Sequence, residues 1–147
     1  MDEEQNNSVQ AGVVVSVVVI TYNHAPYIGE ALDSILAQKT NFAVEICIGE
    51  DESSDGTREI CLDYARRYPK QIRLFLRSRE DVMYFRGRPC GRNNFVKTLA
   101  SCRGKYVALL EGDDYWTDPL KLQEQFDALE ANPGAICCHH WQDVLHE

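Results

Sequence analysis

The sequence has no apolar run long enough to span a bilayer, because the longest, Val13–Ile20, has only eight residues. It also lacks the basic leader of a signal peptide, so we expect a cytoplasmic location, with peripheral attachment to the inner face of the membrane as a further option. The six cysteines show no disulfide-framework spacing, which predicts reduced thiols. Cys137-Cys138-His139-His140 resembles a metal cluster, but adjacent strand residues point to opposite faces, so we predict no site there.

Several functional motifs are missing as well. No G-x-G-x-x-G follows the first apolar segment and no Walker lysine loop is present, which argues against dinucleotide-dependent enzymes and P-loop NTPases. A nucleophile elbow is also missing. The formal net charge of -8 argues against nucleic acid as a partner. An acidic protein that binds an anionic nucleotide would need a metal ion or a local group of arginines.

The composition is that of a globular protein with one domain. Apolar residues make up 44% of the 147 residues, enough for a hydrophobic core. Residues 1–12 are polar and show no apolar period, which predicts a flexible tail before a domain at 13–147.

Alternating strand and helix patterns predict the fold class. Apolar, β-branched segments expected to form strands are 13–20, 44–48, 72–76, 106–110 and the beginning of a fifth at Ala135–Cys138. Helices are expected with Pro26 near the first turn, from the cap at Ser54 or Asp55 to the stop at Pro69, from about Asn94 to Ser101, and after Pro119. The second of these is expected to bury Ile60, Cys61, Tyr64, Ala65 and Tyr68. This order predicts an α/β, Rossmann-like fold with a mostly parallel sheet and helices on both faces.

Polar clusters follow three of the predicted strands. They are Thr21-Tyr22-Asn23, then Asp51 between Glu50 and Glu52, and then Glu111-Gly112-Asp113-Asp114. In open parallel sheets, ligands bind beyond the carboxyl ends of the strands. Taken singly, each cluster is equally well explained as a turn or as a cap of the next helix, by Ser54 or Asp55 in the second case.

The acidic cluster carries the most specific chemistry. Its three carboxylates repel one another unless a cation joins them, and Mg²⁺ takes one or two carboxylates together with phosphate oxygens. An extended backbone would turn Glu111 and Asp113 to one side and Asp114 to the other. The long connection 77–92 adds arginines 77, 79, 86, 88 and 92, which suit phosphate binding or simply form a solvated basic loop.

Taken in order, these segments resemble the family 2 glycosyltransferases of the GT-A fold. The resemblance rests on Ser16–Asn23, on Gly49–Thr57, on Arg103–Asp114 and on the Asp118–Leu122 segment that follows. It covers nearly everything from Val13 to His140.

The resemblance implies roles for particular residues. Those implied to bind the nucleotide are Thr21, Tyr22 and Asn23 in the pocket, Asp51 at the base, Arg92 as a polar contact, and Glu111 near the ribose. Asp113 and Asp114 are the implied ligands of Mg²⁺ or Mn²⁺. The implied partners are a nucleotide-diphosphate sugar, with a UDP-sugar favoured, and a glycan or lipid acceptor.

The sequence departs from the family pattern in three respects. Glu111 and Glu50 stand where Asp is usual, which adds one methylene at each position. The family also continues for many residues that supply the acceptor site and a catalytic base, so we expect the acceptor half to be absent. None of His139, His140, His146 and Glu147 occupies the position of that base.

The expected function is therefore metal-dependent, inverting sugar transfer. The alternative is a non-catalytic nucleotide-sugar-binding module, completed by a partner chain or by a further C-terminal segment. A phosphoacceptor receiver domain shares the architecture but would need an acid pair where Thr21-Tyr22-Asn23 stands. An incomplete sheet also predicts an exposed edge or apolar patch and a homo-oligomer.

Overall fold

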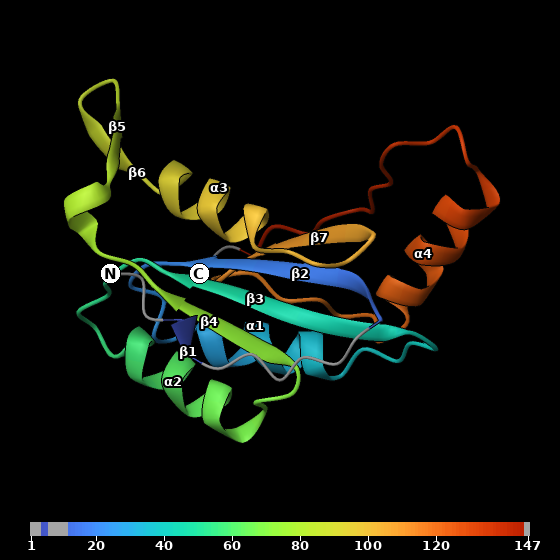
Figure 1. Ribbon diagram of the computed structural model, residues 1–147, viewed down its shortest axis with the longest axis horizontal. Helices are drawn as coiled ribbons and strands as arrows, with labels where there is room; N and C mark the ends of the chain where they lie inside the picture. Colours follow the sequence, from blue (N-terminus) through green and yellow to red (C-terminus); the bar gives the residue numbers. More distant parts are fainter. Residues whose placement is uncertain (1–3, 6–11, 146–147) are drawn as a thin grey trace.

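The computed structural model of the protein describes residues 4–5 and 12–145. Its main sheet has the strand order β1-β4-β3-β2-β7, and its neighbouring strands are parallel except for β1, which pairs antiparallel with β4 (Figure 1). The strands are β1 (Glu4–Gln5), β2 (Val13–Thr21), β3 (Ala43–Glu50), β4 (Ile72–Leu76) and β7 (Tyr106–Glu111). The predicted parallel α/β sheet is confirmed.

Helices cover both faces of this sheet. The helices are α1 (Ile28–Leu36), α2 (Thr57–Arg67), α3 (Arg92–Ala100) and α4 (Lys121–Ala131). α1 and α2 lie below the sheet in Figure 1, whereas α3 lies above it. Among the described residues, no helix combines the length and the apolar character needed to cross a membrane.

The core lies between the sheet and the α1–α2 layer. Val15, Val17 and Val19 of β2 point into it because alternate strand residues share a face, and they meet Leu32 of α1 and Ile48 of β3. β2 is central and buried on both faces, which explains its nearly continuous run of valines.

The long connection after β4 is more ordered than the sequence suggested. It forms a 3-10 turn, η1 (Arg79–Asp81), and a separate hairpin of β5 (Met83–Phe85) and β6 (Arg88–Cys90). Both turn residues, Arg86 and Gly87, have positive φ values of 51° and 77°, as a type I′ hairpin turn requires. The hairpin projects from the body of the domain in Figure 1.

The strand predicted at Ala135–Cys138 is wrong. This segment has irregular backbone and pairs with none of the strands in the described part of the chain, and the side chain of Ile136 is 99% exposed. An extended segment becomes a strand only when a neighbour takes up its backbone hydrogen bonds. Most of the predicted tail, residues 1–12, lies outside the described residues.

A buried polar cluster lies on the opposite face of the sheet, beneath α3. The Glu45 carboxylate pairs with Arg73 at 3.3 Å and accepts a 2.6 Å hydrogen bond from Ser16 Oγ. It also accepts the backbone N–H of Arg103 at 2.8 Å, while Arg73 donates to the Ser101 carbonyl at 2.7 Å. The cluster therefore fixes the α3–β7 connection to the strands and so helps to position β7.

Replacing Glu45 with Ala removes one partner of this buried ion pair. We expect the free energy of unfolding to fall by about 3–5 kcal/mol, because Arg73 is left as an uncompensated buried charge. Urea denaturation measures the effect, and Glu59→Ala, at an exposed position of α2, is the control. A loss no larger than that of the control would contradict this account of the cluster.

One face of β7 is exposed and apolar. Tyr106, Ala108 and Leu110 belong to or pack against the core, whereas the alternate residues Val107 and Leu109 are 40% and 56% exposed. β7 is also the last strand of the main sheet.

The exposed face of β7 predicts self-association. We expect sedimentation velocity to show a concentration-dependent dimer, and Leu109→Glu to shift it toward monomer because a charge replaces the apolar contact. Leu145→Glu, at another exposed leucine, is the control. A strict monomer at high protein concentration would refute the prediction.

Candidate functional site

The carboxyl ends of β2, β3, β4 and β7 form one edge of the sheet. Backbone hydrogen bonds continue past the strands: Asp51 N–H donates to the Thr21 carbonyl at 3.1 Å, and Gly112 N–H donates to the Ile20 carbonyl at 2.9 Å. Arg77 N–H donates to the Glu50 carbonyl at 2.8 Å. The polar clusters predicted after separate strands are therefore held in neighbouring positions.

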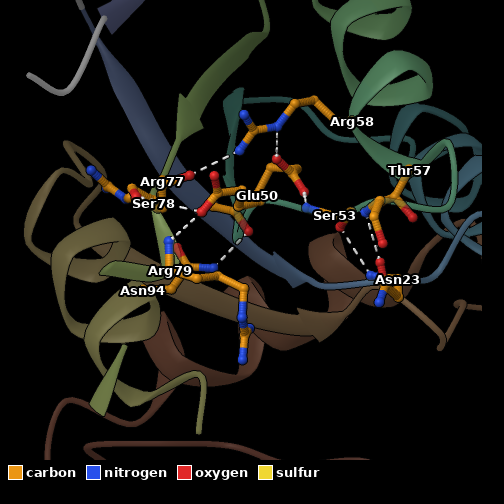
Figure 2. A network of polar contacts seen from close by, with 12 residues as sticks. Asn23, Glu50, Ser53, Thr57, Arg58, Arg77, Ser78, Arg79 and Asn94 are labelled. Carbon is orange, nitrogen blue, oxygen red and sulfur yellow. Dashed lines mark hydrogen bonds and ion pairs between the residues drawn. The ribbon is translucent and has the colours of Figure 1, made fainter. Parts of the chain in front are cut away.

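The loop after β2 is locked to the loop after β3. Asn23 N–H donates to Ser53 Oγ at 2.9 Å, and Asn23 Oδ1 accepts the Ser54 N–H at 3.0 Å (Figure 2). Asn23 has a φ of 54°, a left-handed conformation that Asn tolerates better than most residues. The Asp55 carboxylate accepts the Thr57 N–H at 3.0 Å, but the N-cap of α2 is Gly56, which makes no side-chain cap bond, so the predicted cap by Ser54 or Asp55 is wrong. Asn23 thus supports the shape of the loops.

Glu50 points away from the open edge. It is fully buried, it forms an ion pair with Arg58, and it accepts the Ser53 N–H at 2.7 Å (Figure 2). Arg58 also donates to the Arg77 carbonyl at 2.8 Å. The extra methylene that Glu50 has relative to Asp therefore affects the contacts that stabilise the β3–α2 turn.

Tyr22, Asp51 and Arg79 form a compact group at the open edge. The Tyr22 ring is 39% exposed, while Asp51 is only 6% exposed. Arg79 Nη1 lies 3.1 Å from Asp51 Oδ2, and the Arg79 guanidinium carbon lies 3.9 Å from the centre of the Tyr22 ring. Burial raises the pKa of Asp51 despite the opposing effect of Arg79. A small polar cleft is lined by Asp51 together with Asn94 of α3.

The acidic cluster forms a turn after β7. The Asp114 N–H donates to the Glu111 carbonyl at 3.1 Å, so the backbone does not stay extended beyond Glu111. The predicted extended backbone would turn the Asp114 side chain away from those of Glu111 and Asp113. Because the backbone turns here, that alternation of side chains does not apply. Burial raises the pKa of Glu111, and the charges of Asp113 and Asp114 raise it further. Mutual repulsion among these carboxylates is thus part of the site.

His24 is a site residue that the sequence analysis missed. Its Nε2 lies 3.8 Å from Asp113 Oδ2, and its Nδ1 lies 3.3 Å from Thr21 Oγ1. Thr21 itself is buried, so its hydroxyl supports His24 from within. Nothing in the sequence spacing links residue 24 to residue 113, since only the parallel pairing of β2 and β7 brings them together.

Gly112 allows this close approach. A Cβ on Gly112 would lie 2.6 Å from Thr21 Oγ1 and 2.8 Å from His24 Nδ1, inside normal contact distance. The position therefore requires glycine for close packing between the acidic turn and the end of β2.

The acidic turn offers few metal ligands of its own. Within residues 4–5 and 12–145, no three His, Cys, Asp or Glu side chains converge as a metal-binding group. Half of the Asp113 side chain is exposed (51%), so a ligand can reach this carboxylate from solvent. This donor set fits an ion that takes one or two carboxylates and completes its shell with phosphate oxygens and water.

The predicted arginines do not gather at one point. Arg79 contacts Asp51 and Tyr22, whereas Arg77 is buried against the ring of Phe75. Arg86 lies on the hairpin, and Arg92, at the start of α3, lies 5.8 Å from the ring of Phe85. The nucleotide contact implied for Arg92 stays a prediction.

This arrangement, a parallel sheet with polar and acidic loops at its carboxyl edge, defines an α/β domain of the nucleotide-binding type. Residues 16–145 match the family described as Glycosyl transferase family 2, and the chain belongs to that family. "Uncharacterized protein Rv1520" of Mycobacterium tuberculosis is 44% identical over 133 residues, which cover 90% of this chain and 36% of the relative. "Uncharacterized glycosyltransferase alr2836" of Nostoc sp. is 29% identical over 127 residues, 86% of this chain and 36% of the relative.

Solved structures support the GT-A fold. The mannosyltransferase PcManGT from Pyrobaculum calidifontis, in complex with GDP-Man and Mn²⁺, has a TM-score of 0.63 at 24% identity, covering 86% of this chain and 35% of that one. TarS 1-349 of S. aureus, in complex with UDP, has a TM-score of 0.62 at 23% identity, covering 82% and 33%. The chain thus spans about a third of the length of these relatives.

Gly112→Ala tests the close packing at the site. We expect a lower melting temperature and a disturbed acidic turn, because the added methyl group must push Thr21 and His24 away. Gly134→Ala is a matched control, since nothing lies within 4 Å of a Cβ there. Thermal unfolding compares the two, and equal stability would contradict the packing argument.

Proposed function

We propose that this chain is the donor-binding portion of a metal-dependent, inverting glycosyltransferase that uses a nucleotide-diphosphate sugar. The observation that carries the proposal is the convergence of Tyr22, Asp51 and the Glu111–Asp114 turn at one sheet edge, built from the ends of three neighbouring strands. Such a site offers an aromatic face and a carboxylate at one end and an acidic turn at the other.

The Tyr22–Asp51 end suits a nucleobase. A half-exposed ring can stack on the face of a base, and a nearly buried carboxylate can accept hydrogen bonds from ring N–H or amino groups. In this proposal Thr21 and Asn23 contribute to the pocket mainly because their hydrogen bonds hold the loop after β2 in place. Arg92 contacts the nucleotide only if its side chain moves away from Phe85.

The acidic turn suits the diphosphate. Asp113 and Asp114 would hold Mg²⁺ or Mn²⁺, and Glu111 would lie nearer the ribose. The ion would offset the negative charge that builds on the departing diphosphate. It would also relieve the repulsion that raises the pKa of Glu111. His24 would orient Asp113 from the protein side.

The donor and acceptor are proposed only as classes. PcManGT is solved with GDP-Man and TarS with UDP-GlcNAc, so relatives of this fold bind different bases and sugars. A UDP-sugar is our favoured donor, and a glycan or a lipid is the acceptor class. We nominate no catalytic base among the described residues.

Asp113→Ala tests the proposed metal site. We expect calorimetry to show Mn²⁺-dependent binding of UDP, GDP or dTDP by the wild type, and its loss in the variant, because a carboxylate ligand of the ion is removed. Asp127→Ala, an exposed carboxylate on α4, is the matched control. Unchanged affinity in Asp113→Ala would refute the assignment, and failure of every nucleotide to bind would count against the function itself.

A transfer assay separates the two functional alternatives. Sugar transfer by these 147 residues alone would exclude the non-catalytic binding module. Metal-dependent nucleotide binding without transfer would fit either alternative, because the chain spans about a third of its curated relatives.

A further inference from the structure

Arg79 lies over one face of the Tyr22 ring. Its guanidinium carbon lies 3.9 Å from the ring centre, a stacking distance, and its Nη1 donates to Asp51 Oδ2 at 3.1 Å. The side chain is only 25% exposed, so it fills much of the space between the ring and the carboxylate.

These two contacts are those a nucleobase would make at the proposed site. A guanidinium is flat and delocalised, it stacks on aromatic rings, and its edge carries N–H donors that match a carboxylate. A base stacked on this face of Tyr22 with an N–H directed at Asp51 Oδ2 would use the same ring face and the same oxygen as Arg79. Arg79 and a base therefore cannot occupy this position together.

We propose that Arg79 is a built-in surrogate for the base, which the donor nucleotide must displace to bind. The inference rests on the proposed function, since it takes Tyr22 and Asp51 as the base-binding pair. In this inference Arg79 competes with the ligand and so helps to determine its affinity. When no nucleotide is bound, Arg79 compensates the charge of Asp51.

The local structure allows the side chain to leave without moving the backbone. The Arg79 N–H donates to Glu52 Oε2 at 2.6 Å, and Ser78 Oγ donates to the same atom at 3.4 Å. Glu52, which has a φ of 61°, accepts both of these hydrogen bonds. Because these contacts involve the backbone and Ser78, the guanidinium can swing out while η1 keeps its place.

Neutral nucleosides isolate this competition from any effect of Arg79 on the phosphates. We expect Arg79→Ala to bind uridine, guanosine or thymidine, whichever the wild type prefers, about two- to fivefold more tightly, because no stacked cation has to be displaced. Arg79→Lys should fall between the two, since it keeps the charge but loses the flat stacking group. NMR titration of the full chain measures each dissociation constant.

Arg86→Ala is the matched control. It removes the same charge from the hairpin, where Arg86 lies against Phe85 and is part of no contact described for Tyr22 or Asp51, so its nucleoside affinity should equal that of the wild type. Equal or weaker nucleoside binding by Arg79→Ala would overturn the inference while leaving the proposed function standing. If neither nucleosides nor nucleoside diphosphates with Mn²⁺ bind any of the proteins, the proposed function fails and the inference fails with it.

Discussion

The candidate site depends on the parallel pairing of β2 with both β3 and β7. That pairing continues past the strand ends through the Asp51 and Gly112 amides, so an aromatic loop and an acidic turn meet beside the central strand. The acids of the turn repel one another and raise the pKa of Glu111, and His24 opposes this effect without cancelling it. The fold holds the acidic turn in place with backbone hydrogen bonds and the close contact at Gly112. In the proposed function, the carboxylates of this turn take up a cation together with a phosphate ligand.

Much of the fold could be predicted from sequence because its signals are local. The valine run of β2, the presence of α1 and α2, and the bounds of β4 follow from apolar periodicity and from turn residues. The position of the three polar clusters at one edge also followed, since the carboxyl ends of parallel strands lie together. The prediction failed at Ala135–Cys138, where an apolar segment has no strand beside it to pair with.

The finer features of the site could not be predicted because they depend on contacts between distant residues. The pairing of His24 with Asp113 and the stacking of Arg79 on Tyr22 each join separate loops. The contact of Glu50 with Arg58 depends on how the turn between β3 and α2 folds back. The buried Glu45–Arg73 pair was equally hidden, since a charged residue within a strand pattern is ordinarily expected to face water. The roles of Asp51, Arg92, Glu111, Asp113 and Asp114 toward a ligand stay predictions.

Paramagnetic relaxation by Mn²⁺ tests the central claim most directly, because the ion broadens the NMR signals of amides close to it. With a nucleoside diphosphate present, our account predicts that low concentrations of Mn²⁺ selectively broaden the amides of Glu111–Asp114, and that the same ion without nucleotide has a much weaker effect. Equal broadening with and without nucleotide, or broadening centred on another part of the chain, would contradict the account.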